Sequence, residues 1–513
     1  MSSLASQKWV AAVLTIGVLA LYALFLAEPI HLATADLGRH LKNGELWWQH
    51  RELLFTNFYS YTEPTHPFIN HHWGSGAVFF LVWKLLGFQG VHLCFIVLHL
   101  GALFIMLRCA TERAGIGVAA LLSMLMIPIL AIRAEVRPEA LSALFTAIFF
   151  RRLTSCRTQQ CSLRHLWWLP VLEAVWVNLH SYFVLGPALI AAFLIEALCD
   201  TARQARVRTL ARLLGLTLAA TLLNPSGING ALVPLTMFRE YGYRLFENQS
   251  VPFLLARFTM PRLWLFIGVI AGLAASLLVA WPRARRAPPI SEALTALGIS
   301  AMAWGAYRNL ALFGLLAIPL MATGVGTLPA ARRPRSEGGA ALIAVLIWCL
   351  AVFGPSSVWS PPSAAGRGLG LEPGDSAAAA FIRQERLPGP IFNNYDIGGY
   401  LIFHLFPEHR VFVDNRPEAY SAAFFTNLYI PMQEDDAVWR KAEAQFGFNM
   451  IVFHRHDLTP WGQRFMIARV DDPAWAPVFV DRDTLILLKR HERNRSAIDR
   501  FEIPRSAFHV TSR

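Results

Sequence analysis

Long apolar stretches recur along the first two thirds of this sequence. The segment WVAAVLTIGVLALYALFLA near the start has about 19 apolar residues, enough to cross a hydrocarbon core of about 30 Å. Hydrophobic residues make up 55% of the chain, which excludes an ordinary soluble enzyme. The pattern predicts an α-helical multi-pass membrane protein.

The net charge of +12 comes largely from arginines that gather in short clusters between the apolar stretches. Such clusters mark cytoplasmic loops, so they indicate membrane orientation and not nucleic-acid binding. Residues 74–87 are too short for a crossing and are predicted to form an interfacial or re-entrant helix. If all these arginine clusters are cytoplasmic, about eleven transmembrane helices are expected. They lie at 9–27, 91–108, 114–132, 138–150, 166–178, 182–199, 209–223, 262–281, 290–305, 309–328 and 339–356.

The apolar character ends near residue 357, where a Pro, Gly and Ser stretch begins. An odd number of crossings places everything beyond it outside the cytoplasm. The expected organisation is a transmembrane domain (1–356) with a large first outer loop (28–90), a linker (357–374), an extracytoplasmic α/β domain (375–491) and a polar tail (492–513).

Short strands and helices alternate in the predicted α/β domain. Helices are expected at DSAAAAFIRQERL and DDAVWRKAEAQFG, and a helix or buried segment at IGGYLIFHLF. Strands are expected at PIFNN, RVFVDN and FNMIVFHR, and two more in WAPVFVDRDTLILLKR, joined through Arg482 and Asp483.

Polar groups embedded in apolar sequence all fall on the outer face in this topology. This convergence predicts one outward-facing polar cavity at the membrane surface, built from EPIHLATADLGRH, NHHW, RAEVRPE, NLH, NPSG and YRN.

Asp36 follows the first span, at a membrane boundary where a carboxylate is costly unless something compensates it. His40 shares its helix face four residues on, and Glu28 lies shortly before. These three residues are the catalytic candidates, with Asp36 as a general base. The structural alternative is that Asp36 caps the helix LGRHLKNGELWWQH.

His71 and His72 precede Trp73 at the start of the short outer stretch. Adjacent histidines point apart, so they are poor ligands for one metal, and no cysteine has zinc-ligand spacing. We expect His72 to orient Asp36 or a phosphate and His71 to line the cavity. An interfacial pair beside an aromatic-belt tryptophan is the alternative.

Arg137 lies in RAEVRPE on the outer face, where a guanidinium can grip a phosphate bidentately. Arg308 in AYRNLALF has no acid near it in the sequence, so it is a second phosphate-binding candidate. The alternatives are an ion pair of Arg137 with Glu135 or Glu139, and insertion of Arg308 among lipid phosphates.

Five further polar residues are candidates for the acceptor or cavity: Asn178, His180, Asn224, Asp414 and Arg416. Those at helix ends are equally suited to hydrogen-bond backbone groups that have lost their partner within the helix. Asp414 and Arg416, with Asn415 between them, equally suit an internal salt bridge.

Taken in order, these motifs resemble the GT-C superfamily of polyprenyl-phosphate-sugar-dependent glycosyltransferases, in a bacterial and largely uncharacterised branch. The resemblance covers nearly the whole chain and rests on DLGRHLKNGE, FYSYT, HHW, RPE, NLH, NPSG and GGYL with VFVDNR. Glutamate is expected where His72 stands, so no acidic or metal role is carried over there.

The resemblance implies that Asp36 is the catalytic base of the first outer loop, and that Arg137 and Arg308 hold the donor's phosphate. It implies an inverting transfer from a polyprenyl-phosphate-linked sugar to an envelope lipid, glycan or protein acceptor, at the outer face of a bacterial inner membrane. Some members use a divalent metal; without a clear second acidic motif beyond Glu28, a metal is not favoured. Two other classes remain: a transporter or flippase for lipid-linked saccharides, and a non-catalytic assembly protein.

Overall fold

The computed structural model describes residues 2–51, 53–158, 162–199, 204–237, 239–283, 289–328, 337–353 and 366–509. The chain divides into two compact units, each formed by separate stretches of sequence. The first, here the helical unit, comprises Met1–Glu28, His92–Thr236 and Leu245–Leu369. The second, here the mixed unit, comprises Pro29–Val91, Met237–Arg244 and Gly370–Arg513. Of the expected linker, residues 357–365 lie outside the described residues.

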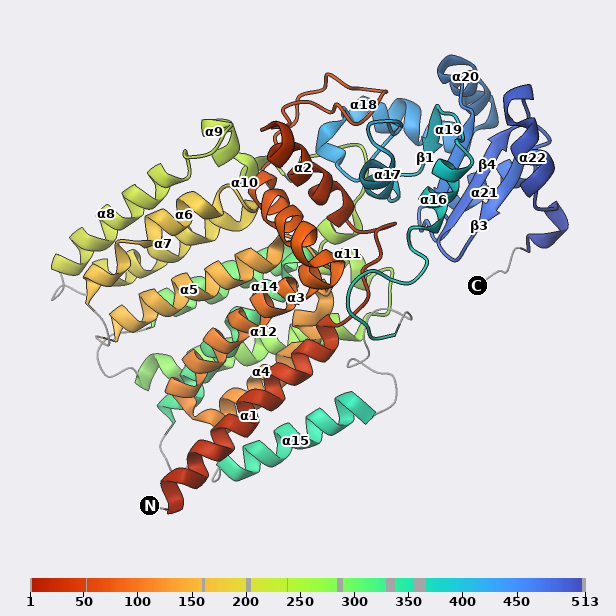
Figure 1. The fold of residues 1–513 in the computed structure, drawn as a ribbon. Coiled ribbons are helices and arrows are strands. Elements are labelled where there is room, and N and C mark those ends of the chain that lie inside the picture. Colours follow the sequence, from red (N-terminus) through yellow and green to blue (C-terminus); the bar gives the residue numbers. More distant parts are fainter. Residues whose placement is uncertain are drawn as a thin grey trace. The chain divides into compact units, whose positions relative to one another are not determined.

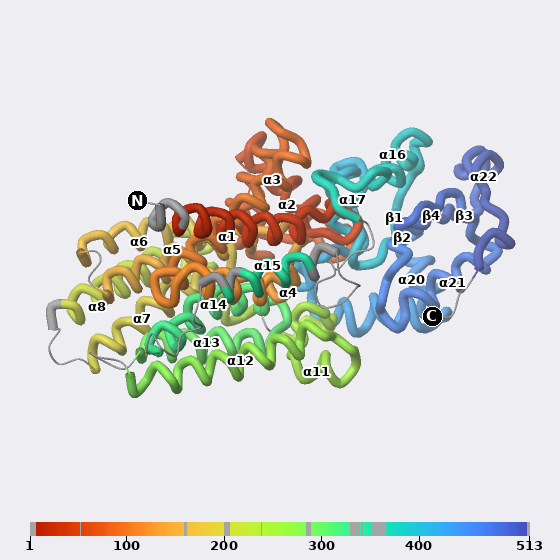
Figure 2. The backbone as a smooth tube through the Cα atoms, turned by 90° about the horizontal axis from the view of Figure 1, so that it is seen from below, coloured from red at the N-terminus to blue at the C-terminus, as the bar shows by residue number. Residues whose placement is uncertain are grey.

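Among the described residues, every span expected from the sequence overlaps a helix of the helical unit. α14 packs against α12, α4 and α13, so it lies inside the bundle (Figures 1 and 2). The helices are α1 (Ser2–Leu26), the second part of α3 (Trp73–Ala114), α4 (Ile116–Leu130), α5 (Glu139–Arg157), α6 (Leu169–Trp176), α7 (Leu185–Leu198), α8 (Gln204–Ala220), α12 (Pro261–Ala280), α13 (Ile290–Gly305), α14 (Leu310–Thr327) and α15 (Glu337–Phe353), with the short α9 (Gly227–Ala231), α10 (Val233–Thr236) and α11 (Val251–Leu255) between α8 and α12.

Six helical segments among the described residues are long and apolar enough to cross a membrane. They are Gln7–Leu26, Trp73–Ala114, Ile116–Arg133, Ser181–Leu198, Pro261–Arg283 and Tyr307–Thr327. The chain is therefore a multi-pass membrane protein, as predicted. The count of about eleven crossings stays a prediction.

The expected interfacial stretch at 74–87 is helical and ends at a break in α3. Gly87 has φ +66° and ψ −167°, a conformation that favours glycine and interrupts the helix. Before the break, α3 meets α2 (Leu37–His50) within the mixed unit, where Trp48 Nε1 donates to the Ala77 carbonyl oxygen at 2.9 Å. A Cβ on Gly44 would stand 2.1 Å from the carbonyl oxygen of Gly76, so only glycine allows this approach.

The C-terminal part of the mixed unit contains a four-stranded sheet of order β1-β2-β4-β3. β1 (Ile391–Asn393) pairs parallel with β2 (Met450–His454), and β4 (Thr484–Lys489) pairs antiparallel with β2 and with β3 (Trp475–Val480). The helices are α16 (Ala377–Gln384), α17 (Gly398–Leu405), α18 (Ala422–Phe424), α19 (Pro431–Glu434), α20 (Asp436–Phe446), α21 (Gly462–Asp471) and α22 (Arg495–Phe501).

The predicted strand RVFVDN is wrong. Residues 410–415 form one isolated bridge, between Val411 and Ser60, and no ladder. Side chains take the place of a neighbouring strand: the backbone N–H of Phe412 donates to the Asn393 side-chain oxygen at 2.9 Å, and its carbonyl accepts from Ser60 Oγ at 3.1 Å. The apolar alternation of this segment therefore reflects burial of an extended chain.

The segment expected as a polar tail contains α22. Ile498 is buried, and beyond the helix the backbone N–H of Ile503 donates to the carbonyl oxygen of Pro477 in β3 at 2.8 Å. Phe501 of α22 also meets Phe381, with ring centroids 5.1 Å apart. These few apolar residues among charged neighbours form a pattern too short to give a periodic signal.

Candidate functional site

Asp36 stands at the first turn of α2, but its carboxylate does not cap the helix. Its Oδ1 atom accepts a hydrogen bond from Asn415 Nδ2 at 2.6 Å, and Arg39 Nη2 lies 3.7 Å away. The Asp36 side chain is 22% exposed, so it is held by protein groups while part of it remains accessible. The helix-cap alternative is therefore not what this side chain does.

Asn415 is itself held in place from two sides. Arg39 Nε donates to its Oδ1 atom at 3.2 Å, and α17 packs against it. A Cβ on Gly399 would lie 3.1 Å from Asn415 Nδ2, and one on Gly398 would lie 2.4 Å from the Cα of Asp414. The glycine pair of GGYL thus serves close packing against the VFVDNR segment.

Asp414 and Arg416, the residues that flank Asn415, form a buried salt bridge. Both side chains are 0% exposed, with 2.6 Å between Arg416 Nη2 and Asp414 Oδ2. Arg416 Nη2 also donates to Asn57 Oδ1 at 2.7 Å, and the Tyr420 hydroxyl donates to Asp414 at 3.1 Å. Of the two readings offered by the sequence, the internal salt bridge is the one these contacts form.

Glu418 is a second carboxyl group beside Arg39 that the sequence analysis did not identify. Burial raises its pKa, and the positive charges of Arg39 and Arg416 only partly oppose that effect. Arg39 therefore acts electrostatically on both Glu418 and Asp36.

The three candidate histidines come together in the mixed unit. The rings of His40 and His72 meet edge to face at 5.3 Å, and those of His71 and His72 lie 3.9 Å apart. The backbone N–H of His40 donates to the Asp36 carbonyl at 3.1 Å, so His40 lies one helical turn after Asp36. The role of His72 toward Asp36 stays a proposal.

Arg137 and Arg308 are joined in the helical unit through Glu247. Arg137 Nη1 lies 3.1 Å, and Arg308 Nη1 3.3 Å, from this carboxylate. Burial alone would raise the pKa of Glu247, but the nearby guanidinium groups hold it well below its usual range. The expectation that Arg308 lacks an acidic partner is wrong, because the partners come from distant segments.

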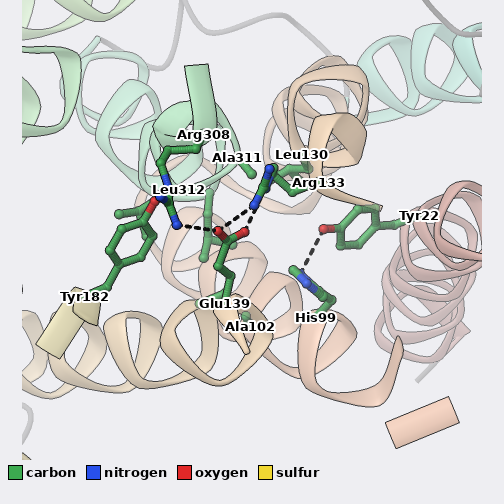
Figure 3. Close-up of a pocket in the computed structure, with 12 residues that line it drawn as sticks. Tyr22, His99, Ala102, Leu130, Arg133, Glu139, Tyr182, Arg308, Ala311 and Leu312 are labelled. Atoms are coloured by element: carbon green, nitrogen blue, oxygen red, sulfur yellow. Dashed lines mark hydrogen bonds and ion pairs between the residues drawn. The ribbon is translucent and has the colours of Figure 1, made fainter. Parts of the chain in front are cut away.

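Arg133 and Glu139 complete this network. Arg133 contacts Glu247 at 2.7 Å. It also contacts Glu139 at 2.7 Å, and Arg308 Nη2 lies 3.3 Å from Glu139 (Figure 3). Arg137 also contacts the exposed Glu135 at 2.7 Å. With Glu135 included, three guanidinium groups face three carboxylates, so the network is balanced in charge.

A cavity of about 30 Å³ adjoins the network, which is room for one or two water molecules. Figure 3 shows Arg133, Arg308, Glu139, His99 and Tyr182 around it. Two hydroxyl groups in the cavity wall have partners: Tyr22 contacts His99 Nδ1 at 3.1 Å, and the Tyr182 hydroxyl donates to Asn309 at 2.6 Å. The cavity is too small for a sugar.

The polar residues at helix ends bind local backbone or neighbouring helices. Asn178 Nδ2 donates to the carbonyls of Ala174 and Leu223 at 2.8 Å each, and Asn224 Nδ2 donates to those of Thr221 and Gly227. His180 Nδ1 lies 3.0 Å from Ser142 Oγ and is buried. Glu28, just after α1, acts electrostatically on Arg262. A ligand role for these four residues remains a prediction.

No protein-family model and no curated protein matches the chain. Several solved structures match its fold. AglB, the oligosaccharyltransferase of Archaeoglobus fulgidus, in complex with an inhibitory peptide and a dolichol-phosphate, gives a TM-score of 0.62 at 10% identity, covering 92% of this chain and 73% of that chain. ArnT from Cupriavidus metallidurans, bound to undecaprenyl phosphate, gives 0.57 at 14% identity, covering 94% and 98%.

The mycobacterial arabinofuranosyltransferase AftD gives a TM-score of 0.51 at 15% identity, covering 95% of this chain and 40% of that chain. These similarities show that the chain has the fold of the GT-C membrane glycosyltransferases. The predicted fold class, a helical membrane protein with a small C-terminal α/β region, is confirmed.

Three residues of the two clusters were not singled out from the sequence. Glu247 is one acid in the polar segment GYRLFENQS, and nothing in its neighbours indicates arginine partners. Arg39 follows Asp36 by three residues on the same helix, and this spacing indicates an ion pair between them. Glu418 follows VFVDNR by two residues, and only its burial distinguishes it from a surface acid.

Proposed function

We propose that the chain is an inverting glycosyltransferase of the outer face of the bacterial cytoplasmic membrane. It would move a sugar from a polyprenyl-phosphate donor to an envelope lipid, glycan or protein acceptor. The fold supports this proposal, because AglB and ArnT are seen with dolichol-phosphate and undecaprenyl phosphate. At this level of sequence identity the fold alone is common to them, so the reaction must be argued from the side chains.

The observation that carries the proposal is the Asp36 carboxylate, partly exposed and held at 2.6 Å by Asn415. A general base must keep its orientation while an acceptor hydroxyl or amine approaches. A surface aspartate would rotate freely, whereas this one is fixed by an amide that the buried Asp414–Arg416 pair anchors. In this proposal Asp36 is the catalytic base, and His40 and Glu28 assist it.

The reaction would be one displacement. The acceptor oxygen or nitrogen attacks the anomeric carbon as its proton passes to Asp36, and the bond from that carbon to the phosphate oxygen breaks. The bonding pair leaves with the polyprenyl phosphate, so configuration at the anomeric carbon inverts and no covalent enzyme intermediate forms.

Arg137 and Arg308 would hold the donor phosphate and stabilise the charge that develops on it, with His72 as a further contact. The contact of Arg137 with Glu135 supports this role, since Glu135 is 57% exposed and a phosphate would replace it without breaking a buried pair. We propose no metal for this step. His71, Asn178, His180, Asn224, Asp414 and Arg416 remain candidates for acceptor contact or cavity lining, the last two through their support of Asn415.

The decisive experiment replaces Asp36 with asparagine in a strain that lacks the chromosomal gene. The introduced amide keeps an oxygen that can accept from Asn415 but loses the basicity of the carboxylate. We expect normal membrane insertion and a drop in glycosyl transfer on the order of a thousandfold, the effect of losing a positioned base. Mass spectrometry of glycolipids and envelope glycans identifies the decoration that disappears in the deletion strain and measures its return.

Asp435→Asn is the matched control. Asp435 caps α20 through a hydrogen bond to the Ala437 N–H at 2.7 Å and lies in the same unit. We expect this variant to restore the decoration fully. Full restoration by Asp36→Asn would instead favour a transporter or an assembly protein, neither of which needs a base at this position.

A further inference from the structure

A second cluster of ligating groups lies in the mixed unit, apart from the residues used above. It consists of His31, Glu372 and Asp483, whose candidate ligand atoms all lie within 4.8 Å of one another. The three come from the first outer loop, the chain before α16 and the turn between β3 and β4. Among the described residues this is the one group of three or more such side chains that fits a metal ion.

Backbone pairing brings the first two residues together. Ile30 bridges Leu371 in parallel, with its N–H donating to Gly370 O at 2.8 Å and its carbonyl accepting from the Glu372 N–H at 3.0 Å. This pairing places His31 next to Glu372, and their side chains are in contact. The geometry is therefore fixed by main chain and does not depend on two flexible side chains finding each other.

The third residue is fixed by the β3–β4 turn. Asp481 Oδ1 accepts from the backbone N–H groups of Asp483 and Thr484 at 2.9 and 2.7 Å. The Arg455 backbone N–H binds the Asp483 carbonyl at 2.7 Å. Asp483 is thus held on a rigid hairpin, as a metal ligand needs to be.

Buried polar atoms beside the cluster lack a hydrogen-bond partner in the described structure. His454 is 6% exposed and its Nδ1 atom has no such partner, while its ring acts electrostatically on Asp483 and His31. Asp375 accepts from the Leu32 N–H at 3.1 Å through Oδ1, but its buried Oδ2 has no partner. Orphaned buried groups of this kind call for an ion or water.

The carboxylates around the cluster also favour a bound cation. Glu372, Asp483, Asp375 and Asp481 lie close together, and the cations beside them are Arg482, which pairs with Glu372, and Arg455, whose Nη1 donates to the Asp481 carbonyl oxygen. His456 Nε2 also lies 3.9 Å from Asp483 Oδ1. A surplus of negative charge in a partly buried site is costly unless a cation neutralises it. An imidazole nitrogen with carboxylate oxygens suits a first-row transition ion better than Ca²⁺ or Mg²⁺, which prefer oxygen alone.

We propose that His31, Glu372 and Asp483 bind a divalent transition-metal ion, zinc being the ion to test. Three protein ligands leave a fourth position for water or for a neighbouring side chain. The ion would clasp the start of the first outer loop to the β3–β4 hairpin. Because its ligands differ from the sugar-transfer residues, this site is structural and independent of the proposed reaction.

The experiment measures zinc retained by the full-length protein in detergent after dialysis with micromolar zinc and removal of free metal. We expect one equivalent in the wild type. His31→Gln and Asp483→Asn should each weaken binding on the order of a hundredfold and lose that equivalent. Elution volume in size-exclusion chromatography checks that the variants are folded.

Two variants serve as controls and should keep the zinc. His66 lies 3.9 Å from Glu63, a histidine–glutamate pair without a third ligand, so His66→Gln tests for unspecific loss. Asp36→Asn removes the proposed base and changes none of the three proposed zinc ligands. Zinc lost from Asp36→Asn and kept by His31→Gln would place the ion at the transfer site and overturn this proposal alone.

A measurement on the wild type needs no variant to fold. Addition of EDTA should lower the thermal unfolding midpoint, and zinc should restore it, since an ion that binds only the folded state stabilises that state. Absence of retained zinc, or no effect of EDTA, would show that His31, Glu372 and Arg482 form an ion-pair network only. Either result would overturn the proposal.

Discussion

The Asp36 carboxylate accepts a 2.6 Å hydrogen bond from the side-chain amide of Asn415, across a sequence separation of 379 residues. This contact joins the segment after α1 to the C-terminal part of the chain inside one compact unit. The DLGRH motif supplies the carboxylate, and the VFVDNR motif supplies the amide that fixes its direction.

The first prediction concerns Asn415. Asn415→Ala removes the hydrogen bond and leaves Asp36 basic but mobile, so glycosyl transfer should fall on the order of a hundredfold, the scale of a misplaced catalytic group. The measurement is the level of the restored envelope decoration in the deletion strain. Asn427→Ala, at an exposed position in the same unit, should restore it fully. Equal restoration by both variants would remove Asn415 as a positioning residue.

The second prediction separates the two roles of Arg137. If it holds a donor phosphate, Arg137→Lys should weaken donor binding by about tenfold, because an ammonium cannot make the bidentate contact. Binding of the undecaprenyl phosphate carrier to purified protein measures this directly. Glu135→Gln removes the exposed partner, 57% exposed, and should leave carrier affinity unchanged or slightly higher. Unchanged affinity in Arg137→Lys would leave only the ion pair.

Local patterns in the sequence predict the helices and strands well, since hydrophobic periodicity and caps are local. Asp435, for example, caps α20 at the position that the motif DDAVWRKAEAQFG indicates. RVFVDN has the alternation of a strand, yet its partners are side chains such as Asn393. Alternation reports which side chains are buried, whereas a ladder also needs a neighbouring strand.

The sequence singles out candidate residues, but it does not indicate which residues they contact. Asp36 and Arg137 stand out because charge beside apolar sequence is rare. The partners Asn415 and Glu247 are ordinary residues in polar segments, and their roles depend on long-range folding. Arg308 is an example: it has no acidic residue near it in the sequence, yet it contacts Glu139 and Glu247 in the structure.

The third prediction uses the close approach of α17 to VFVDNR. A Cβ on Gly398 would stand 2.4 Å from the Asp414 Cα and 2.5 Å from the Val413 oxygen, so Gly398→Ala must displace this backbone. We expect a loss of about 1–3 kcal/mol in stability and weaker transfer, because Asn415 moves with the segment. Thermal unfolding in detergent measures the loss of stability. Gly298→Ala is the control, because a Cβ at Gly298 meets nothing within 4 Å. A stability equal to that of the control would contradict the packing argument.

The fourth prediction concerns acid stability and His404 in α17. Burial, with added repulsion from Arg383 and Lys42, lowers the pKa of His404 to about 4. Between this value and about 6.5 the unfolded chain binds a proton that the folded chain does not, so stability falls as pH drops through that window. The loss of stability from this histidine is about 2 kcal/mol at pH 5.

His404→Leu should remove this loss, so the difference between the thermal unfolding midpoints at pH 7.5 and pH 5 should shrink. His456→Leu, whose side chain is 61% exposed, should keep the wild-type difference. If His404→Leu keeps it as well, the acid sensitivity arises elsewhere.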